Sequence, residues 1–274
     1  MTEARDLASG KGEKDENFPV ASLLLRPEQR GPILAFYRFA RAADDIADNA
    51  EAAAGTKLDL LARMRAGLDG EGAPEAIALR EIMAARRIDP IHAHELLDAF
   101  VRDVTVTRYQ NWDELIAYCR LSAMPVGRYV LDVHREGREL WPANDALCSA
   151  LQIINHLQDC GKDYRLLNRV YIPLDTGLKV EELDGSRATP GLRAILTSLV
   201  ERTRGLLDQS AGFSALIRDR RLAAEVAVIQ RLAISLCDRL EMHDPLSERV
   251  HHGKVEAALL SLRAAFPALL RRAA

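Results

Sequence analysis

Apolar side chains recur three or four positions apart along almost the whole of this chain, and neither an alternating stretch nor an internal repeat interrupts them. That spacing is typical of helices that bury one face. Pro, Asn, Asp and Gly residues at the ends of the periodic stretches mark where helices start and stop. Helices are predicted over residues 31–53, 58–68, 74–87, 90–107, 111–122, 125–136, 191–212, 218–241 and 255–273, and over a long segment from Asn144 that includes residues 152–163. The pattern therefore predicts an all-α fold.

The longest stretch without a helical period covers residues 164–190. Loops of this length are uncommon in a compact helical protein and often cover a binding site. The stretch contains Arg169 and Tyr171, a cation and an aromatic side chain suited to a phosphate and an apolar ligand. We expect it to form a lid; the alternative is a loop in which both side chains lie in solvent.

Composition fits a globular protein and excludes some partners. The 274 residues carry a formal net charge of −3, which gives no general attraction to nucleic acid. Four scattered cysteines without CxxC spacing argue against disulfides and structural zinc, and they fit a reducing cytoplasm. Residues 1–16 are polar and are expected to fray, whereas residues 17–274 contain no linker and are predicted to form one domain. No apolar run reaches the length of a membrane span.

Two pairs of aspartates carry the candidate chemistry. Asp44 and Asp48 are four positions apart on a predicted helix, and so are Asp159 and Asp163. On a helix this spacing places both carboxylates on one face, one turn apart. The two charges of a pair repel each other, and Mg²⁺ is the natural cation to offset that repulsion because it binds carboxylate, water and phosphate oxygens. The two pairs are therefore predicted to converge on one diphosphate through bridging Mg²⁺.

Each of these residues also has a simpler interpretation. A single aspartate pair on a helix is usually a solvated face, but both pairs here lie among apolar residues. Arg41 precedes Asp44 by three positions, which suits either an ordinary intrahelical ion pair or a guanidinium that binds phosphate. Gln152 and Asn155 either satisfy polar atoms of the core or complete the shell of a metal. Tyr118 either packs in the core or contacts a ligand.

The last predicted helix, residues 255–273, has an apolar face and ends near Arg271 and Arg272. Packing of that face against the core is the default interpretation. Weak contact with a membrane surface is the alternative, and it would place the protein at the cytoplasmic side of a bilayer.

These segments together resemble the squalene/phytoene synthase family of head-to-head isoprenoid synthases. Residues 44–48 look like the first aspartate-rich motif of that family, and residues 155–163 look like the second. Residues 16–22 and 118–127 are similar to a bacterial branch that acts in hopanoid synthesis. The match extends from about residue 17 to beyond Tyr171.

The resemblance implies a single-domain isoprenoid-synthase helical bundle with a central apolar cavity. It implies that five residues hold Mg²⁺ at the substrate diphosphate: Asp44, Asp48, Asn155, Asp159 and Asp163. It implies that six residues contact the substrate: Phe18, Tyr37, Arg41, Gln152, Arg169 and Tyr171. Tyr118 matches a catalytic tyrosine assigned to the reacting cation.

The implied reaction is Mg²⁺-dependent ionisation of presqualene diphosphate, followed by rearrangement and capture by water, which gives hydroxysqualene and diphosphate. The chain lacks a nucleotide-binding glycine motif, so capture by water is favoured over reduction by NADPH. One alternative is a condensing synthase that uses farnesyl diphosphate to make presqualene diphosphate, squalene or phytoene. Another is a non-catalytic helical scaffold that binds prenyl lipids. In the enzymatic case, handover to other enzymes of the squalene pathway is expected.

The chain departs from the family pattern at two places. His156 and Leu157 stand where a bulkier aromatic pair is expected for this bacterial branch, which changes the shape of the pocket. Asp15 and Asn17 stand where the family often has serine at a phosphate contact.

Overall fold

The computed structural model describes residues 25–270, which are almost entirely helical and form no β-strand beyond one isolated parallel bridge between Arg108 and Val170. This confirms the predicted all-α fold. The chain separates into two compact units. The first comprises the described part of Met1–Val106 with Pro125–Gly137, and the second comprises Thr107–Met124 with the described part of Arg138–Ala274. Phe18, a predicted substrate contact, lies outside the described residues, as does the predicted tail at residues 1–16.

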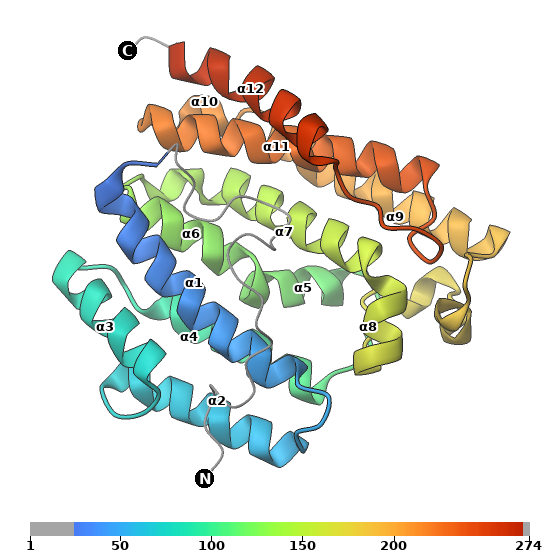
Figure 1. The fold of residues 1–274 in the computed structure, drawn as a ribbon, viewed down its shortest axis with the longest axis horizontal. Coiled ribbons are helices and arrows are strands. Elements are labelled where there is room, and N and C mark those ends of the chain that lie inside the picture. The colour runs from blue at the N-terminus through green and yellow to red at the C-terminus, as the bar shows by residue number, and fades with distance from the viewer. Residues whose placement is uncertain (1–24, 271–274) are drawn as a thin grey trace. The chain divides into compact units, whose positions relative to one another are not determined.

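The first unit is built around one long helix, α1, against which α3 and α4 pack, while α2 packs on α3 and α4 (Figure 1). Its helices are α1 (Pro27–Asp48), α2 (Ala54–Asp69), α3 (Pro74–Arg86), α4 (Ile91–Thr105) and nearly all of α6 (Met124–Val133). Phe36 of α1 stacks on Tyr129 of α6 with ring centroids 4.1 Å apart, and the Tyr129 hydroxyl donates to the Pro32 carbonyl at 3.2 Å. These contacts attach α6 to α1 and fix the helix that carries the first aspartate pair.

Helix α1 starts at Pro27, four residues before the predicted start at Gly31, and Pro32 lies inside it. A proline inside a helix has no N–H to donate, so the carbonyl four residues earlier loses its partner. That carbonyl belongs to Glu28, and the guanidinium of Arg86 on α3 donates a hydrogen bond to it. The side chain thus supplies the missing donor, and a proline that suggested a helix start is accommodated one turn inside.

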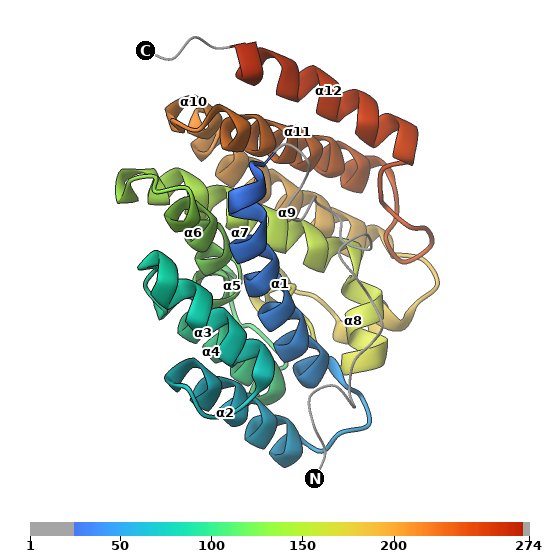
Figure 2. The same cartoon turned by 60° about the vertical axis from the view of Figure 1, so that its left-hand side comes forward.

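The second unit stacks α9, α7 and α12 around α11, and α12 lies on the outer side of α11 (Figure 2). Its α-helices are α5 (Trp112–Ser122), α7 (Trp141–Gln158), α8 (Cys160–Leu167), α9 (Pro190–Gln209), α10 (Phe213–Leu216), α11 (Arg220–Met242) and α12 (Lys254–Leu270). Three short 3-10 helices join them: η2 (Arg138–Leu140), η3 (Leu174–Thr176) and η4 (Val180–Asp184). Helices α5, α9 and α11 begin at side-chain caps, from Asn111, Thr189 and Asp219 respectively.

The predicted long helix differs from the structure at both ends. It starts at Trp141 rather than at Asn144, because Pro142 occupies the first turn, where a missing N–H costs nothing. Asn144 is buried inside the helix, and its amide donates to the Met124 carbonyl at 3.3 Å. The helix then breaks at Asp159 into α7 and α8. Gly161, two residues after the break, allows other segments to pack closely on α8, since a Cβ at that position would lie 2.5 Å from Leu246 and 3.1 Å from the Leu183 carbonyl.

Candidate active site

The first aspartate pair lies near the carboxyl end of α1, beside an arginine that already binds two carboxylates. Arg41 Nη1 lies 2.9 Å from Asp44 Oδ2, and Arg41 Nη2 lies 2.7 Å from Asp45 Oδ1. The side chains of Arg41 and Asp45 are only 17% and 8% exposed. The intrahelical ion pair considered from the sequence is therefore present, and it includes Asp45 as well. These two bonds hold the guanidinium in a fixed direction on the face that carries Asp44 and Asp48.

The charge of Asp44 is only partly compensated by Arg41. The pKa of Asp44 is raised from its usual 3.8 to about 7, chiefly by burial and then by the charge of Asp48, while Arg41 lowers it only in part. Asp103, a buried residue of α4, and Asp45 raise it further. Sequence reasoning missed Asp103 because it is a single aspartate on a different helix, and only the packing of α4 against α1 brings its charge near.

A raised pKa has a definite consequence for stability. Below about pH 4, Asp44 is protonated in the folded and the unfolded chain, and no penalty arises. Between about pH 4 and pH 7, the carboxyl group of Asp44 ionises more easily in the unfolded chain than in the folded one. Asp44 therefore destabilises the fold increasingly over this range, and the destabilisation reaches its full value above about pH 7. Its side chain is 35% exposed, so solvent screens part of the effect. A bound cation would remove the rest, and carboxylate oxygens are the donors that Mg²⁺ takes.

The second aspartate pair spans the junction of α7 and α8. The Asp159 amide donates to the Asn155 carbonyl at 2.9 Å, and the Asp163 amide donates to the Asp159 carbonyl at 2.8 Å. The helical hydrogen bonds thus continue through the break, and the two carboxylates stay one turn apart. Asp159 is 42% exposed with Lys162 Nζ at 3.4 Å, whereas Asp163 is 16% exposed with His156 Nδ1 at 3.9 Å.

His156 joins this acidic pair to a cluster of aromatic rings. Gln152 Nε2 lies 3.1 Å from His156 Nε2. An amide nitrogen can only donate, so His156 Nε2 accepts this hydrogen bond, and His156 Nδ1 faces Asp163. The predicted contact residue Gln152 therefore orients a histidine. Asn155, its neighbour on the same helix, is half-buried.

Three tyrosines and His156 form an aromatic cluster within the second unit. The His156 ring stacks on Tyr171 with centroids 3.5 Å apart and an interplanar angle of 13°. Tyr118 lies 5.4 Å from Tyr171 and 5.9 Å from His156, and Tyr109 lies 5.6 Å from Tyr171. The structure thus brings together Tyr118 and Tyr171, two of the candidate site residues, and adds two residues that sequence reasoning did not assign. Tyr109 could not be found from periodicity because it lies in the link between α4 and α5.

The segment that follows α8, residues 168–175, forms a wall that backbone hydrogen bonds join to the link between α4 and α5. The Val170 amide donates to the Thr107 carbonyl at 2.9 Å, and the Leu174 amide donates to the Tyr109 carbonyl at 3.0 Å. Val170 and Tyr171 are buried, with 2% and 7% exposure. A neighbouring extended segment, which periodicity cannot reveal, thus supplies hydrogen bonds to residues 168–175. The lid expected over residues 164–190 stays a prediction.

Arg169 is buried in the same wall, with 5% exposure, and its backbone amide donates to the Asp163 carbonyl at 3.1 Å. The alternative that Arg169 and Tyr171 both lie in solvent is therefore excluded. Tyr37 is half-buried on α1, one turn before Arg41.

The donor sets suit a metal that keeps outside ligands. Among residues 25–270, no group of three or more His, Cys, Asp or Glu side chains is close enough to enclose a metal ion. Each aspartate pair offers two carboxylates within its own unit. Mg²⁺ is commonly bound in this way, by one or two carboxylates together with water and substrate phosphates. The residues present thus fit Mg²⁺ better than a metal that requires a closed protein cage, such as structural zinc.

Comparison with known proteins identifies the family to which this chain belongs. Residues 12–256 match the family described as squalene/phytoene synthase. The chain is 55% identical to a hydroxysqualene synthase of Zymomonas mobilis, over 96% of this chain and 91% of that protein. It is 51% identical to a hydroxysqualene synthase of Rhodopseudomonas palustris, over 99% of this chain and 95% of the relative. The chain therefore belongs to the squalene/phytoene synthase family of isoprenoid synthases, as the aspartate motifs predicted.

Solved structures agree with this assignment. A squalene synthase from Alicyclobacillus acidocaldarius superposes with a TM-score of 0.73 at 30% identity, covering 87% of this chain and 92% of that one. A dehydrosqualene synthase crystallised with a ligand superposes with a TM-score of 0.80 at 19% identity, covering 96% and 95% of the two chains. The second likeness concerns the fold alone. The all-helical fold predicted from the sequence is therefore that of the squalene synthases.

Proposed function

We propose that this enzyme ionises presqualene diphosphate and directs water to the rearranged cation, which yields hydroxysqualene and diphosphate. The observation that carries the proposal is the pair of relatives named hydroxysqualene synthase, which are 55% and 51% identical over nearly the full length of this chain. The two aspartate pairs and the buried aromatic cluster are the features such a reaction needs. The aspartate pairs bind the departing diphosphate, and the aromatic cluster faces the carbocation.

The diphosphate is bound by both aspartate pairs. Asp44 and Asp48 of α1, and Asp159 and Asp163 at the α7–α8 junction, would hold Mg²⁺ together with Asn155. Mg²⁺ bound there supplies the positive charge that stabilises the leaving diphosphate. The raised pKa of Asp44 supports this role, because burial beside Asp48 leaves a carboxylate whose ionised form is favoured only with a cation nearby.

Two arginines bind the phosphate oxygens directly. The ion pairs of Arg41 with Asp44 and Asp45 aim its guanidinium along the acidic face of α1. The backbone amide of Arg169 donates to the Asp163 carbonyl, which supports a role for Arg169 at the same diphosphate as the second pair. Planar guanidinium groups suit phosphate because they donate two parallel hydrogen bonds. Tyr37 and Phe18 complete the substrate contacts that we propose.

The aromatic cluster stabilises the cation that forms when the diphosphate leaves. Aromatic faces attract cations, and the attraction grows when water is excluded. Tyr118 and Tyr171 are 3% and 7% exposed, so their rings lie in such an environment. Tyr118 is the catalytic residue of this proposal. Because the cluster is apolar, it also protects the cation until the rearrangement is complete.

The setting of the reaction follows from the same proposal. Presqualene diphosphate or farnesyl diphosphate is the substrate partner, the enzyme acts in the cytoplasm, and its C30 product passes to other enzymes of the squalene pathway. None of the described helices is both long and apolar enough to cross a bilayer.

Product analysis distinguishes this function from the alternatives. Purified protein is incubated with Mg²⁺ in ¹⁸O-labelled water, without NADPH, and given presqualene, farnesyl or geranylgeranyl diphosphate in separate reactions. We expect presqualene diphosphate to give hydroxysqualene that contains ¹⁸O, because the oxygen comes from water. Accumulation of presqualene diphosphate or phytoene would show a condensing synthase instead. If Mg²⁺ promoted diphosphate release from none of the three substrates, the result would favour the non-catalytic scaffold.

A further inference from the structure

Helix α12 packs on α11 in an unusual orientation: it buries small residues and exposes large ones. Its fully buried residues are Ala265 and Ala268, with 9% and 3% exposure. Apart from the half-buried Leu260, its large apolar side chains are in solvent, with the following exposed fractions: Val255 75%, Leu259 52%, Leu262 68%, Phe266 65%, Leu269 38% and Leu270 64%. Core packing was the default expectation for this apolar face, and the structure contradicts it, because the alanines make the contact with α11.

The exposed side chains form one continuous stripe, which we call the α12 stripe: Val255, Leu259, Leu262, Phe266, Leu269 and Leu270. Their spacings of three and four positions place them on one face of the helix. The other large apolar side chains that are exposed among residues 25–270 are scattered singly: Ile91, Val126, Leu166, Leu216 and Met242. Single exposed apolar residues are ordinary, whereas a contiguous stripe indicates a contact surface.

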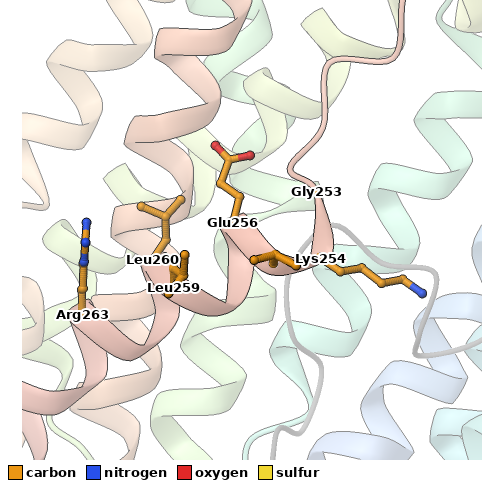
Figure 3. A pocket seen from close by; sticks show the side chains of 7 residues that line it. Gly253, Lys254, Glu256, Leu259, Leu260 and Arg263 are labelled. Carbon is orange, nitrogen blue, oxygen red and sulfur yellow. The ribbon is translucent and has the colours of Figure 1, made fainter.

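The polar residues beside the stripe are basic. A shallow, open depression of about 560 Å³ at the start of α12 is lined by Leu259 and Leu260, with Lys254 and Arg263 extending from the helix (Figure 3). The one acidic residue of α12, Glu256, is bound by Arg239 of α11, which lowers the pKa of that carboxyl. The sequence continues after Leu270 with Arg271 and Arg272. The stripe is therefore flanked by positive charge, which complements an anionic surface.

We propose that the α12 stripe docks this protein on the surface of an anionic lipid bilayer. Its apolar side chains would enter the boundary between headgroups and acyl chains, and Lys254 and Arg263 would contact the headgroup phosphates. Helices that lie in the plane of a membrane surface combine an apolar face with lysine and arginine in this way. None of the described helices, α12 included, is both long and apolar enough to span a bilayer.

A second copy of the chain is a poorer occupant of the stripe. A helix of this length is roughly 25 Å long, so a stripe about 10 Å wide covers only a few hundred Å², whereas a stable dimer buries about 800 Å² per partner. Pairing two α12 helices about a two-fold axis, parallel or antiparallel, would also bring Arg263 close to its own copy, since this residue lies near the middle of Lys254–Leu270. Like charges at the centre of so small an interface would oppose association.

Vesicle co-sedimentation of the full chain tests the proposal. Wild-type protein is mixed with vesicles of phosphatidylcholine alone or of phosphatidylcholine with phosphatidylglycerol. We expect the wild type to bind the anionic vesicles, and this binding should weaken with salt. The double variant Leu262→Ser, Phe266→Ser should bind at least about tenfold more weakly, because two large side chains no longer enter the lipid. Leu216→Ser is the matched control, since Leu216 is 61% exposed but lies on α10, and it should leave binding unchanged. Arg263→Glu should weaken binding to anionic vesicles only.

All substituted side chains are exposed, so circular dichroism of the variants should match that of the wild type. Absence of wild-type binding to anionic vesicles would overturn the proposal, and so would equal binding by the double variant. A wild-type dimer in sedimentation velocity that the double variant converts to monomer, without vesicle binding by either, would assign the stripe to a second copy. These measurements use no substrate, so their outcome is independent of the proposed reaction.

Discussion

Replacing Asp48 or Asp159 by asparagine is expected to reduce diphosphate release by roughly a hundredfold to a thousandfold, the scale of losing one electrostatic contact to a developing anion. Asparagine nearly conserves volume, so the change removes the charge of one metal ligand from either pair. Turnover of presqualene diphosphate is measured by diphosphate release at saturating Mg²⁺. Helical circular dichroism should be unchanged, because neither carboxylate is needed to hold its helix. Relief of repulsion with Asp44 should even stabilise the metal-free Asp48→Asn protein.

Two control variants separate this loss from a general effect of removing negative charge. Asp59 on α2 and Asp208 on α9 are exposed helical aspartates, one in each unit and both outside the two pairs. Asp59→Asn and Asp208→Asn should retain turnover close to that of the wild type. If Asp48→Asn and Asp159→Asn also retained it, the two-pair site would be wrong, although membership of the family would stand.

Replacing Arg169 by alanine is the second change with a large expected effect. Arg169 is 5% exposed, and its backbone amide donates to the Asp163 carbonyl, so this residue is buried and its backbone is tied to the second pair. A buried guanidinium is strongly coupled to the anions it faces, and we propose that the substrate diphosphate is one of them. Affinity for inorganic diphosphate with Mg²⁺, measured by calorimetry, should fall by roughly tenfold or more, the scale of one charge-assisted hydrogen bond. Arg169→Lys keeps the charge but loses the two parallel bonds, so its affinity should lie in between.

The matched control for Arg169 is Arg165, an exposed arginine on α8 whose guanidinium donates to the Leu183 carbonyl at 3.2 Å. Arg165→Ala should leave diphosphate affinity unchanged. A drop in the melting temperature of Arg169→Ala without any loss of diphosphate affinity would make Arg169 a structural residue of the wall and would contradict its proposed contact with substrate.

Local sequence patterns predicted the helices of this protein well, because helical period and capping residues act within a few positions. Two of the errors at helix starts involve prolines. Pro32 indicated a start that lies at Pro27, since the sequence does not reveal that Arg86 supplies the donor lost at the Glu28 carbonyl. Pro142 lies in the first turn of α7, where a proline is well tolerated, so this helix begins ahead of the predicted start at Asn144.

The parts of the site that depend on packing could not be predicted. Asp44, Asp48, Asp159 and Asp163 were found because each pair is local in sequence. Asp103 and Tyr109 were missed because their relation to the site arises only when α4 packs on α1 and when an extended segment pairs with residues 168–175. The same limit applies to α12, whose apolar period is visible in the sequence although the choice of face that meets α11 is not.

Crystallography with manganese tests most directly the central claim, that both aspartate pairs bind one diphosphate. Crystals are grown with Mn²⁺ and a thiolodiphosphate analogue that cannot ionise, since Mn²⁺ takes the same oxygen ligands as Mg²⁺ and can be located by anomalous scattering. We expect Mn²⁺ ions at a single diphosphate, with oxygens of Asp44 or Asp48 on one side and of Asp159 or Asp163 on the other. Mn²⁺ held by only one pair, with the diphosphate bound there and the other pair remote from it, would contradict the claim.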